Sequence, residues 1–204
     1  LQDSIPYTQE QIESSPLRCP LPDIASAMEN EINTARVRGD SVGGTVVGWC
    51  QGLPAGLGDP VYDKLDADLA KAMISINAAK FFELGSGWAA SSGHASDYND
   101  PILAADTSEW THIKTATNHA GGVLGGMSTG TPLWFRVGFK PPSTIAIHQN
   151  SVDHLGQPLV LKARGRHDPC VVPRAVPVVE AMLALVVLDH WLGFPSAKIQ
   201  RLLP

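Results

Sequence analysis

The chain has few charged residues for its length and no run of basic ones. Lys, Arg, Asp and Glu make up 17% of its 204 residues, and the formal net charge is -5. A protein that binds nucleic acid usually carries a basic patch or stripe, so we expect no nucleic-acid partner. The hydrophobic content of 44% is that of a soluble globular protein. The length suits one domain with a substantial core, or two small ones.

Cysteine is also scarce. Cys19, Cys50 and Cys170 are far apart and odd in number, which argues against a disulfide framework and favours reduced thiols in a cytosol-like compartment. The chain begins Leu-Gln-Asp, without Met, a basic leader or a signal-type apolar run. This beginning predicts a processed chain or a piece of a longer protein.

One long apolar run, Ala175–Leu192, approaches the length of a membrane span. Glu180, Asp189 and His190 interrupt it. We therefore expect a helix buried on most sides inside a protein, and no membrane partner.

Periodicity along the chain predicts an α+β fold in which apolar helices pack on a mostly antiparallel sheet. Ile24, Met28, Ile32 and Ala35 recur at helical spacing, and Gly39 should end that helix. Gly43-Gly44 predicts a bulge or a close backbone approach. The long Gly-rich segment 84–131 has little periodicity, which is typical of functional loops. The other elements expected are strands over 41–50, 133–139, 143–149 and 158–163, and helices over 61–80 and 172–192.

The run Gly165-Arg166-His167-Asp168-Pro169-Cys170 places a guanidinium, an imidazole and a carboxylate side by side before the last helix. Arg binds oxyanions in a bidentate manner, and His and Asp are common proton-transfer groups. Arg166 and Asp168 would share a face if the segment is extended. The pattern favours an active-site wall; a salt-bridged loop before a helix is the alternative.

Two other segments suit an anionic ligand less specifically. The Gly-rich residues 118–130 lack the spacing of a phosphate loop or a dinucleotide fold, so a tight turn is the better interpretation, although glycines also let the backbone approach a ligand closely. Lys140-Pro141-Pro142-Ser143-Thr144 ends a predicted strand with a cation and two hydroxyls, which suit a phosphate. An exposed Lys at a strand end is an equally good explanation.

Metal binding is not predicted. His94, His112 and His119 share the long segment with Asp97, Asp100 and Asp106, but no spacing matches a zinc motif. Asp189 and His190 are interpreted as a satisfied structural pair.

The motifs together resemble chorismate synthase. Residues 165–181 (GRHDPCVVPRAVPVVEA) match the family's C-terminal motif almost letter for letter. Further matches cover nearly the whole chain in the family's order. These are residues 39–44 (GDSVGG), 54–65 (PAGLGDPVYDKL), 73–78 (MISINA), 117–122 (TNHAGG) and 135–141 (FRVGFKP).

The resemblance implies a β-α-β sandwich, with helices between antiparallel sheets, and a homotetramer. It implies the 1,4-anti elimination of phosphate from 5-enolpyruvylshikimate 3-phosphate, giving chorismate, with reduced FMN as cofactor. By position, Asp168 corresponds to the family's aspartate near the flavin, which takes part in proton removal, and Arg166 to an arginine at the flavin and the substrate phosphate. The flavin-contacting positions correspond to Asn77, Ala78, Gly125, Lys140, Pro141, Pro142, Ser143 and Thr144.

Two family motifs, the Gly-Glu-Ser-His-Gly type and the Arg-Ser-Ser-Ala-Arg-Glu-Thr type, have no counterpart in this chain. We therefore expect residues 1–204 to be the C-terminal portion of a single chorismate synthase-like domain that needs the missing N-terminal segment. We expect weak or no activity from the chain alone, in the cytoplasm, or in a plastid if the source is a plant or alga. The alternative is a non-catalytic fragment or paralogue that acts as an assembly or flavin-binding module.

Overall fold

The structure, a computed structural model, describes residues 7–103, 114–163, 165 and 167–194. The described residues form two compact units, one of residues 46–137 and 177–194 and the other of residues 7–45 and 138–176. Strands β1 (Gly44–Cys50) and β5 (Leu133–Phe139) and helix α5 (Val172–Gly193) each run from one unit into the other.

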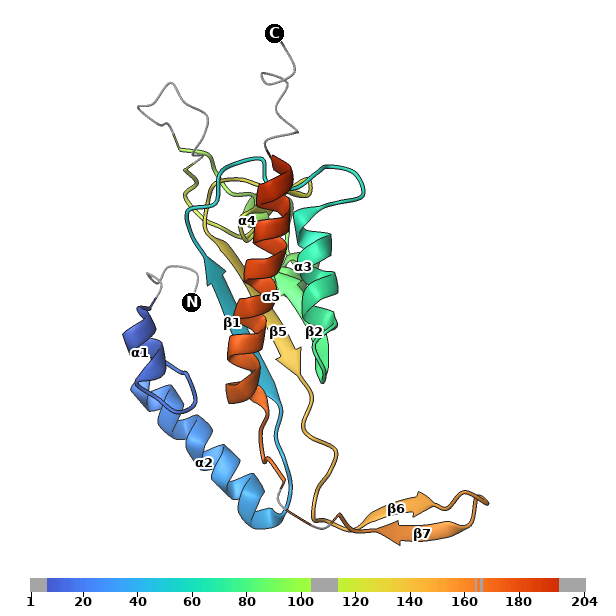
Figure 1. The fold of residues 1–204 in the computed structure, drawn as a ribbon. Helices are drawn as coiled ribbons and strands as arrows, with labels where there is room; N and C mark the ends of the chain where they lie inside the picture. Colours follow the sequence, from blue (N-terminus) through green and yellow to red (C-terminus); the bar gives the residue numbers. More distant parts are fainter. Residues whose placement is uncertain (1–6, 104–113, 164, 166, 195–204) are drawn as a thin grey trace. The chain divides into compact units, whose positions relative to one another are not determined.

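The elements confirm the α+β class expected from the sequence (Figure 1). A three-stranded sheet has the order β1-β5-β2. The described residues also form two antiparallel hairpins, β3-β4 and β6-β7. The remaining elements are α1 (Gln9–Glu13), α2 (Pro22–Arg38), α3 (Leu65–Ile74), β2 (Ala79–Leu84), η1 (Gly87–Ser92), α4 (Ala95–Tyr98), β3 (Val123–Leu124), β4 (Met127–Ser128), β6 (Gln149–Val152) and β7 (Pro158–Leu161).

Helix α2 and strand β5 lie where the sequence predicts them. Pro22 opens α2, and Gly39 ends it with a left-handed φ of 71°. Strand β5 lies between β1 and β2 and is buried along nearly its whole length. Leu133, Phe135 and Val137 are fully buried, as their alternation predicts. The face between them is also covered, because Trp134 is buried and its indole N–H donates to the carbonyl of Asn118 (2.8 Å).

The helix expected over 61–80 is shorter than predicted. Helix α3 ends at Ile74, and Ala79 already begins strand β2. Leu65, Leu69 and Met73 form the buried stripe of α3, which packs on β2 and β4. The apolar residues after Ile76 thus belong to a strand, because the chain reverses at residues 75–78 without the Gly or Pro that normally signals a helix end.

Other boundaries also differ from the expected ones. The segment 84–131, expected to carry little regular structure, contains η1, α4, β3 and β4. The strand expected over 143–149 starts only at Gln149, as β6, and pairs with β7. The β6-β7 turn depends on Asp153, whose Oδ1 accepts the backbone N–H groups of Leu155 and Gln157 (2.8 and 2.9 Å). The polar turn residues therefore indicate the local structure better than the weak alternation over 143–149 does.

Helix α5 has the expected bounds, but it is not buried on most sides. Ala175 and Val179 are buried, whereas Val178, Leu185, Leu188, Trp191 and Leu192 are exposed. Helices α3 and α5 lie side by side on one face of the sheet (Figure 1). A helix that packs on one side only buries only the stripe of residues that faces that side. Among the described helices, α5 is the one long and apolar enough to cross a membrane by length and composition.

Pro177 inside α5 has a local compensation. A proline has no N–H, so the carbonyl of Pro173, four residues earlier, loses its helical partner. The guanidinium of Arg18 donates to that carbonyl instead. The start of α5 is therefore fixed to the segment that follows α1.

Candidate active site

The residues that the resemblance assigns to the flavin and substrate fall into both units. Asn77, Ala78 and Gly125 belong to the unit of 46–137, while Lys140–Thr144 and Asp168 belong to the unit of 138–176. Arg166 lies outside the described residues. Each unit therefore carries a part of the predicted site.

Asn77 and Ala78 form the turn between α3 and β2. Ala78 has a φ of 69°, in the left-handed region that residues other than glycine rarely adopt. Such a conformation costs about 1–3 kcal/mol and is concentrated at functional sites. The turn is held on one side by the N–H of Ala79, which donates to the carbonyl of Ile76 (3.1 Å). The local strain is consistent with the assigned role of this turn.

Gly125 and Gly126 form the two-residue turn of the β3-β4 hairpin. Their φ angles are 62° and 90°, and the flanking pairs are Val123 with Ser128 and Leu124 with Met127. Two positive φ angles are typical of a hairpin of this length, so the tight-turn interpretation is confirmed. A Cβ on Gly126 would collide with Lys64 and Asp59, whereas a Cβ on Gly125 would meet no described atom within 4 Å. Gly125 therefore presents bare, open backbone.

In the other unit, residues 41–43 connect the Lys-Pro segment to the segment of Asp168. The Ser41 hydroxyl donates to the carbonyl of Pro142 (2.6 Å), and the N–H of Val42 donates to the carbonyl of Pro169 (2.8 Å). A Cβ on Gly43 would collide with the carbonyl oxygen of Phe139. This confirms the close approach expected at Gly43-Gly44 and brings two predicted site segments to one place.

Asp168 forms an ion pair with Arg174, in the first turn of α5. The distance from Asp168 Oδ2 to Arg174 Nη1 is 2.7 Å, and the two side chains are 36% and 72% exposed. Arg174 was not among the predicted site residues, although it stands six positions after Asp168 in the same motif. The salt-bridged loop that the sequence left as an alternative is thus present, and it orients the carboxylate.

His167 contributes a second polar group beside Asp168. Its Nε2 is buried and has no hydrogen-bond partner among the described residues. Buried polar atoms in native proteins nearly always have a partner, because leaving one unpaired costs about 1–3 kcal/mol. A hydrogen bond from this nitrogen to a ligand, or to a further part of the protein, would therefore be stabilising.

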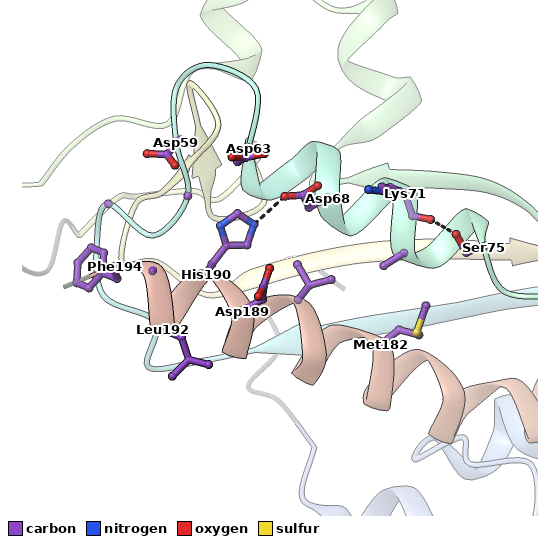
Figure 2. A pocket seen from close by; sticks show the side chains of 15 residues that line it. Asp59, Asp63, Asp68, Lys71, Ser75, Met182, Asp189, His190, Leu192 and Phe194 are labelled. Carbon is purple, nitrogen blue, oxygen red and sulfur yellow. Dashed lines mark hydrogen bonds and ion pairs between the residues drawn. The ribbon is translucent and has the colours of Figure 1, made fainter. Parts of the chain in front are cut away.

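A cavity of about 880 Å³ lies between α3, α5 and the 56–63 loop (Figure 2). His190 Nε2 lies 3.1 Å from Asp68 Oδ2 on its wall, and the His190 side chain is only 9% exposed. The structural pair expected between Asp189 and His190 is therefore wrong in its partner, because residues adjacent in a helix point in different directions. The cavity lining includes none of the described residues predicted for flavin or substrate.

The described residues show no cluster typical of a metal site, and their cysteines form no disulfide. The described residues contain no group of three or more His, Cys, Asp or Glu that could hold a metal ion, and His112 and Asp106 lie outside them. Cys19, Cys50 and Cys170 are free. Burial raises the pKa of the Cys50 and Cys170 thiols, which disfavours the reactive thiolate.

A solved structure has the same arrangement of elements. It is described as "Crystal Structure of Chorismate Synthase", and it aligns with a TM-score of 0.73 and 30% identity over 90% of this chain and 47% of its own. Together the fold and the two site segments define an α+β protein of that structural class.

Sequence comparison gives the family. The chorismate synthase family model matches residues 3–192. Chorismate synthases from Opitutus terrae and Methylacidiphilum infernorum are 51% and 50% identical over 91% and 93% of this chain, and one from Synechocystis is 48% identical over 95%. The chain belongs to the chorismate synthase family. It spans 50–53% of the length of these curated relatives.

Proposed function

We propose that the chain is the C-terminal portion of a working chorismate synthase, which converts 5-enolpyruvylshikimate 3-phosphate to chorismate and phosphate with reduced FMN. The family match over residues 3–192 carries this proposal. Asp168 and the other described residues assigned to the flavin lie on both units, in the turns and connecting segments between helices and strands, which adds support.

The reaction is a 1,4-anti elimination. A ring proton leaves, the electrons of its C–H bond form a new double bond, the ring double bond already present shifts by one position, and the C–O bond to phosphate breaks with its electron pair. Reduced FMN, when bound, supplies electron density transiently and is not consumed. Asp168 takes part in the removal of the proton, and Arg174 holds its carboxylate in place across 2.7 Å. Arg166 binds the substrate phosphate.

Each unit by itself offers features that suit a flavin mononucleotide. Gly125 offers open backbone that a flat ring can approach closely. Lys140 is an exposed cation at the end of β5 and suits the phosphate. His167 Nε2 is a buried polar atom without a partner among the described residues. These three features lie at or beside positions that the resemblance assigns to the cofactor.

The rest of the enzyme supplies the missing motifs and covers α5. Relatives are about twice as long as this chain. Val178, Leu185, Leu188 and Leu192 lie seven, three and four residues apart and are exposed, so they form one apolar stripe. We propose that a further layer packs on this stripe and gives the β-α-β sandwich. A membrane on α5 is the competing occupant.

The same proposal extends to assembly and compartment. The complete enzyme is a homotetramer of such chains, each formed as one domain by residues 1–204 and the missing N-terminal segment. Three free cysteines suit a reducing compartment, the cytoplasm or a plastid.

The decisive experiment measures chorismate formation by the complete protein with reduced FMN under anaerobic conditions. We expect turnover by the wild type, a loss of at least a hundredfold in Asp168→Ala, which is typical for a proton-transfer group, and near-normal turnover in the exposed control Asp23→Asn. Residues 1–204 alone should be inactive. Normal turnover by Asp168→Ala would show that the role of Asp168 is wrong. FMN binding by the complete protein without any turnover would favour the non-catalytic alternative.

A further inference from the structure

Asp100 is a nearly buried carboxylate that fixes a segment far ahead of it in the chain. Its side chain is 9% exposed. Oδ1 accepts the hydroxyl of Thr117 and the backbone N–H of His119, both at 2.7 Å, and Oδ2 accepts the backbone N–H of Ala120 at 2.9 Å. One side chain therefore satisfies three donors that lie 17–20 residues later.

The surroundings of Asp100 favour its charged form. Burial alone would raise the pKa of its carboxyl, but the hydrogen bonds from Thr117, Ala120 and His119, with the nearby imidazole, together lower it below the ordinary value. The His119 ring lies 3.5 Å away from the carboxylate, and its Nδ1 is also 3.1 Å from the carbonyl of Tyr98. Hydrogen bonds to an ionised acceptor are stronger than those between neutral groups.

The segment held by Asp100 leads directly to the flavin-assigned turn. From Ala120, only the two residues Gly121 and Gly122 separate it from β3, and Gly125 follows that strand. The carbonyl of Gly121 accepts the N–H of Trp134 on β5, and the carbonyl of His119 accepts the N–H of Ser86 (3.2 and 2.8 Å). The entry to the hairpin is thereby fixed to the sheet at the residues beside Asp100.

The exit of the hairpin is fixed by a separate set of contacts. The Ser128 hydroxyl accepts the N–H of Leu57 (2.8 Å), and the N–H of Ser128 donates to the carbonyl of Leu57 (2.9 Å). The N–H of Leu65 donates to the carbonyl of Gly126 (2.8 Å). Gly125 thus lies at the tip of a short hairpin with two anchors, and Asp100 supplies the side-chain acceptors of the entry anchor.

We infer that Asp100 is a positioning residue for flavin binding, acting through the backbone of residues 119–125 without touching the cofactor. The inference rests on the proposed function, because it takes Gly125 as a contact of FMN. A site held in place before binding loses less conformational entropy when the ligand arrives, so a loosened hairpin should bind FMN more weakly.

The test uses the complete protein and three variants, assayed well below their melting temperatures. Asp100→Asn keeps the size of the side chain but replaces one accepting oxygen by a donor. Asp97→Asn makes the same change of charge three residues away, at a carboxylate that is 74% exposed. Val179→Ala removes buried contacts on α5 and controls for lost stability.

FMN binding and backbone amide exchange at residues 119–126 are measured for each protein. We expect Asp100→Asn to bind FMN about tenfold or more weakly, a difference of about 1.4 kcal/mol, and to exchange those amides faster, while both controls stay near the wild type. FMN binding by Asp100→Asn equal to the wild type would overturn the inference, as would an equal loss in Val179→Ala. A wild type that binds no FMN would instead sink the proposed function itself.

Discussion

Asp100 and Asp168 are two carboxylates of one protein with opposite surroundings. Asp100 is 9% exposed and receives its three hydrogen bonds from residues of its own unit. Asp168 is 36% exposed and forms an ion pair with an Arg that is itself 72% exposed. The first carboxylate has its three hydrogen-bond donors within this chain and stabilises a loop. The second is held in orientation while much of it stays accessible.

The comparison predicts the largest loss of stability at Asp100. Asp100→Ala leaves the hydroxyl of Thr117 and the N–H groups of His119 and Ala120 without their acceptor. We expect the free energy of unfolding to fall by about 3 kcal/mol, since buried unpaired donors cost about 1–3 kcal/mol each and partial hydration recovers some of it. Urea unfolding of the complete protein measures this. A loss as small as that of Asp168→Ala would erase the contrast between the two residues.

The two glycines of the β3-β4 turn extend the contrast to the hairpin that Asp100 anchors. Gly126→Ala places a Cβ 2.5 Å from Lys64 Cγ and 2.7 Å from the Asp59 carbonyl oxygen, so we expect a loss of about 2 kcal/mol. Gly125→Ala meets no described atom within 4 Å and costs only its left-handed φ, about 1 kcal/mol. Thermal melts rank the two variants by their loss of stability. FMN titration should give the reverse order, because for the same loss of stability Gly125→Ala should weaken FMN binding more than Gly126→Ala.

Much of this contrast could not be read from the sequence. The helical period of Ile24, Met28 and Ala35 predicts α2, and the alternation of β5 predicts its buried face, because each pattern is local. Strand β2 was missed since Ala78 adopts the positive φ that glycine normally supplies. The chain therefore reverses without the expected signal.

The site was predictable to the extent that its residues stand in short motifs. The run of residues 165–170 indicated Asp168 from the types of its neighbours, and Arg174 follows four residues after that run. Asp100 gave no such signal, because its donors are at 117, 119 and 120 and no periodic pattern connects them. Its role depends on a loop closing over it, which only the tertiary structure shows.

Acid should separate the two carboxylates in a further way. The pKa of Asp100 lies below its ordinary value of 3.8, so its contribution to stability is full above about pH 4 and is lost as the pH falls through the lowered pKa. The unfolded chain binds the proton first, and acid therefore favours unfolding. We expect urea midpoints between pH 5 and pH 3 to fall more steeply for the wild type than for Asp100→Asn. Identical slopes would mean that this carboxylate contributes nothing in its charged form.

The smallest expected effect on stability is at Arg174. Its ion pair with Asp168 is largely exposed, and exposed pairs contribute about 0–1 kcal/mol because water screens the charges and two long side chains must be ordered. Arg174→Gln should therefore leave the urea midpoint nearly unchanged. Its effect on turnover should be much larger, since the Asp168 carboxylate loses the group that orients it. If kcat falls while the FMN affinity and the urea midpoint do not, the pair serves chemistry. A variant that unfolds as readily as Asp100→Ala would instead make Arg174 a structural residue, and the distinction between the two carboxylates would fail on that side.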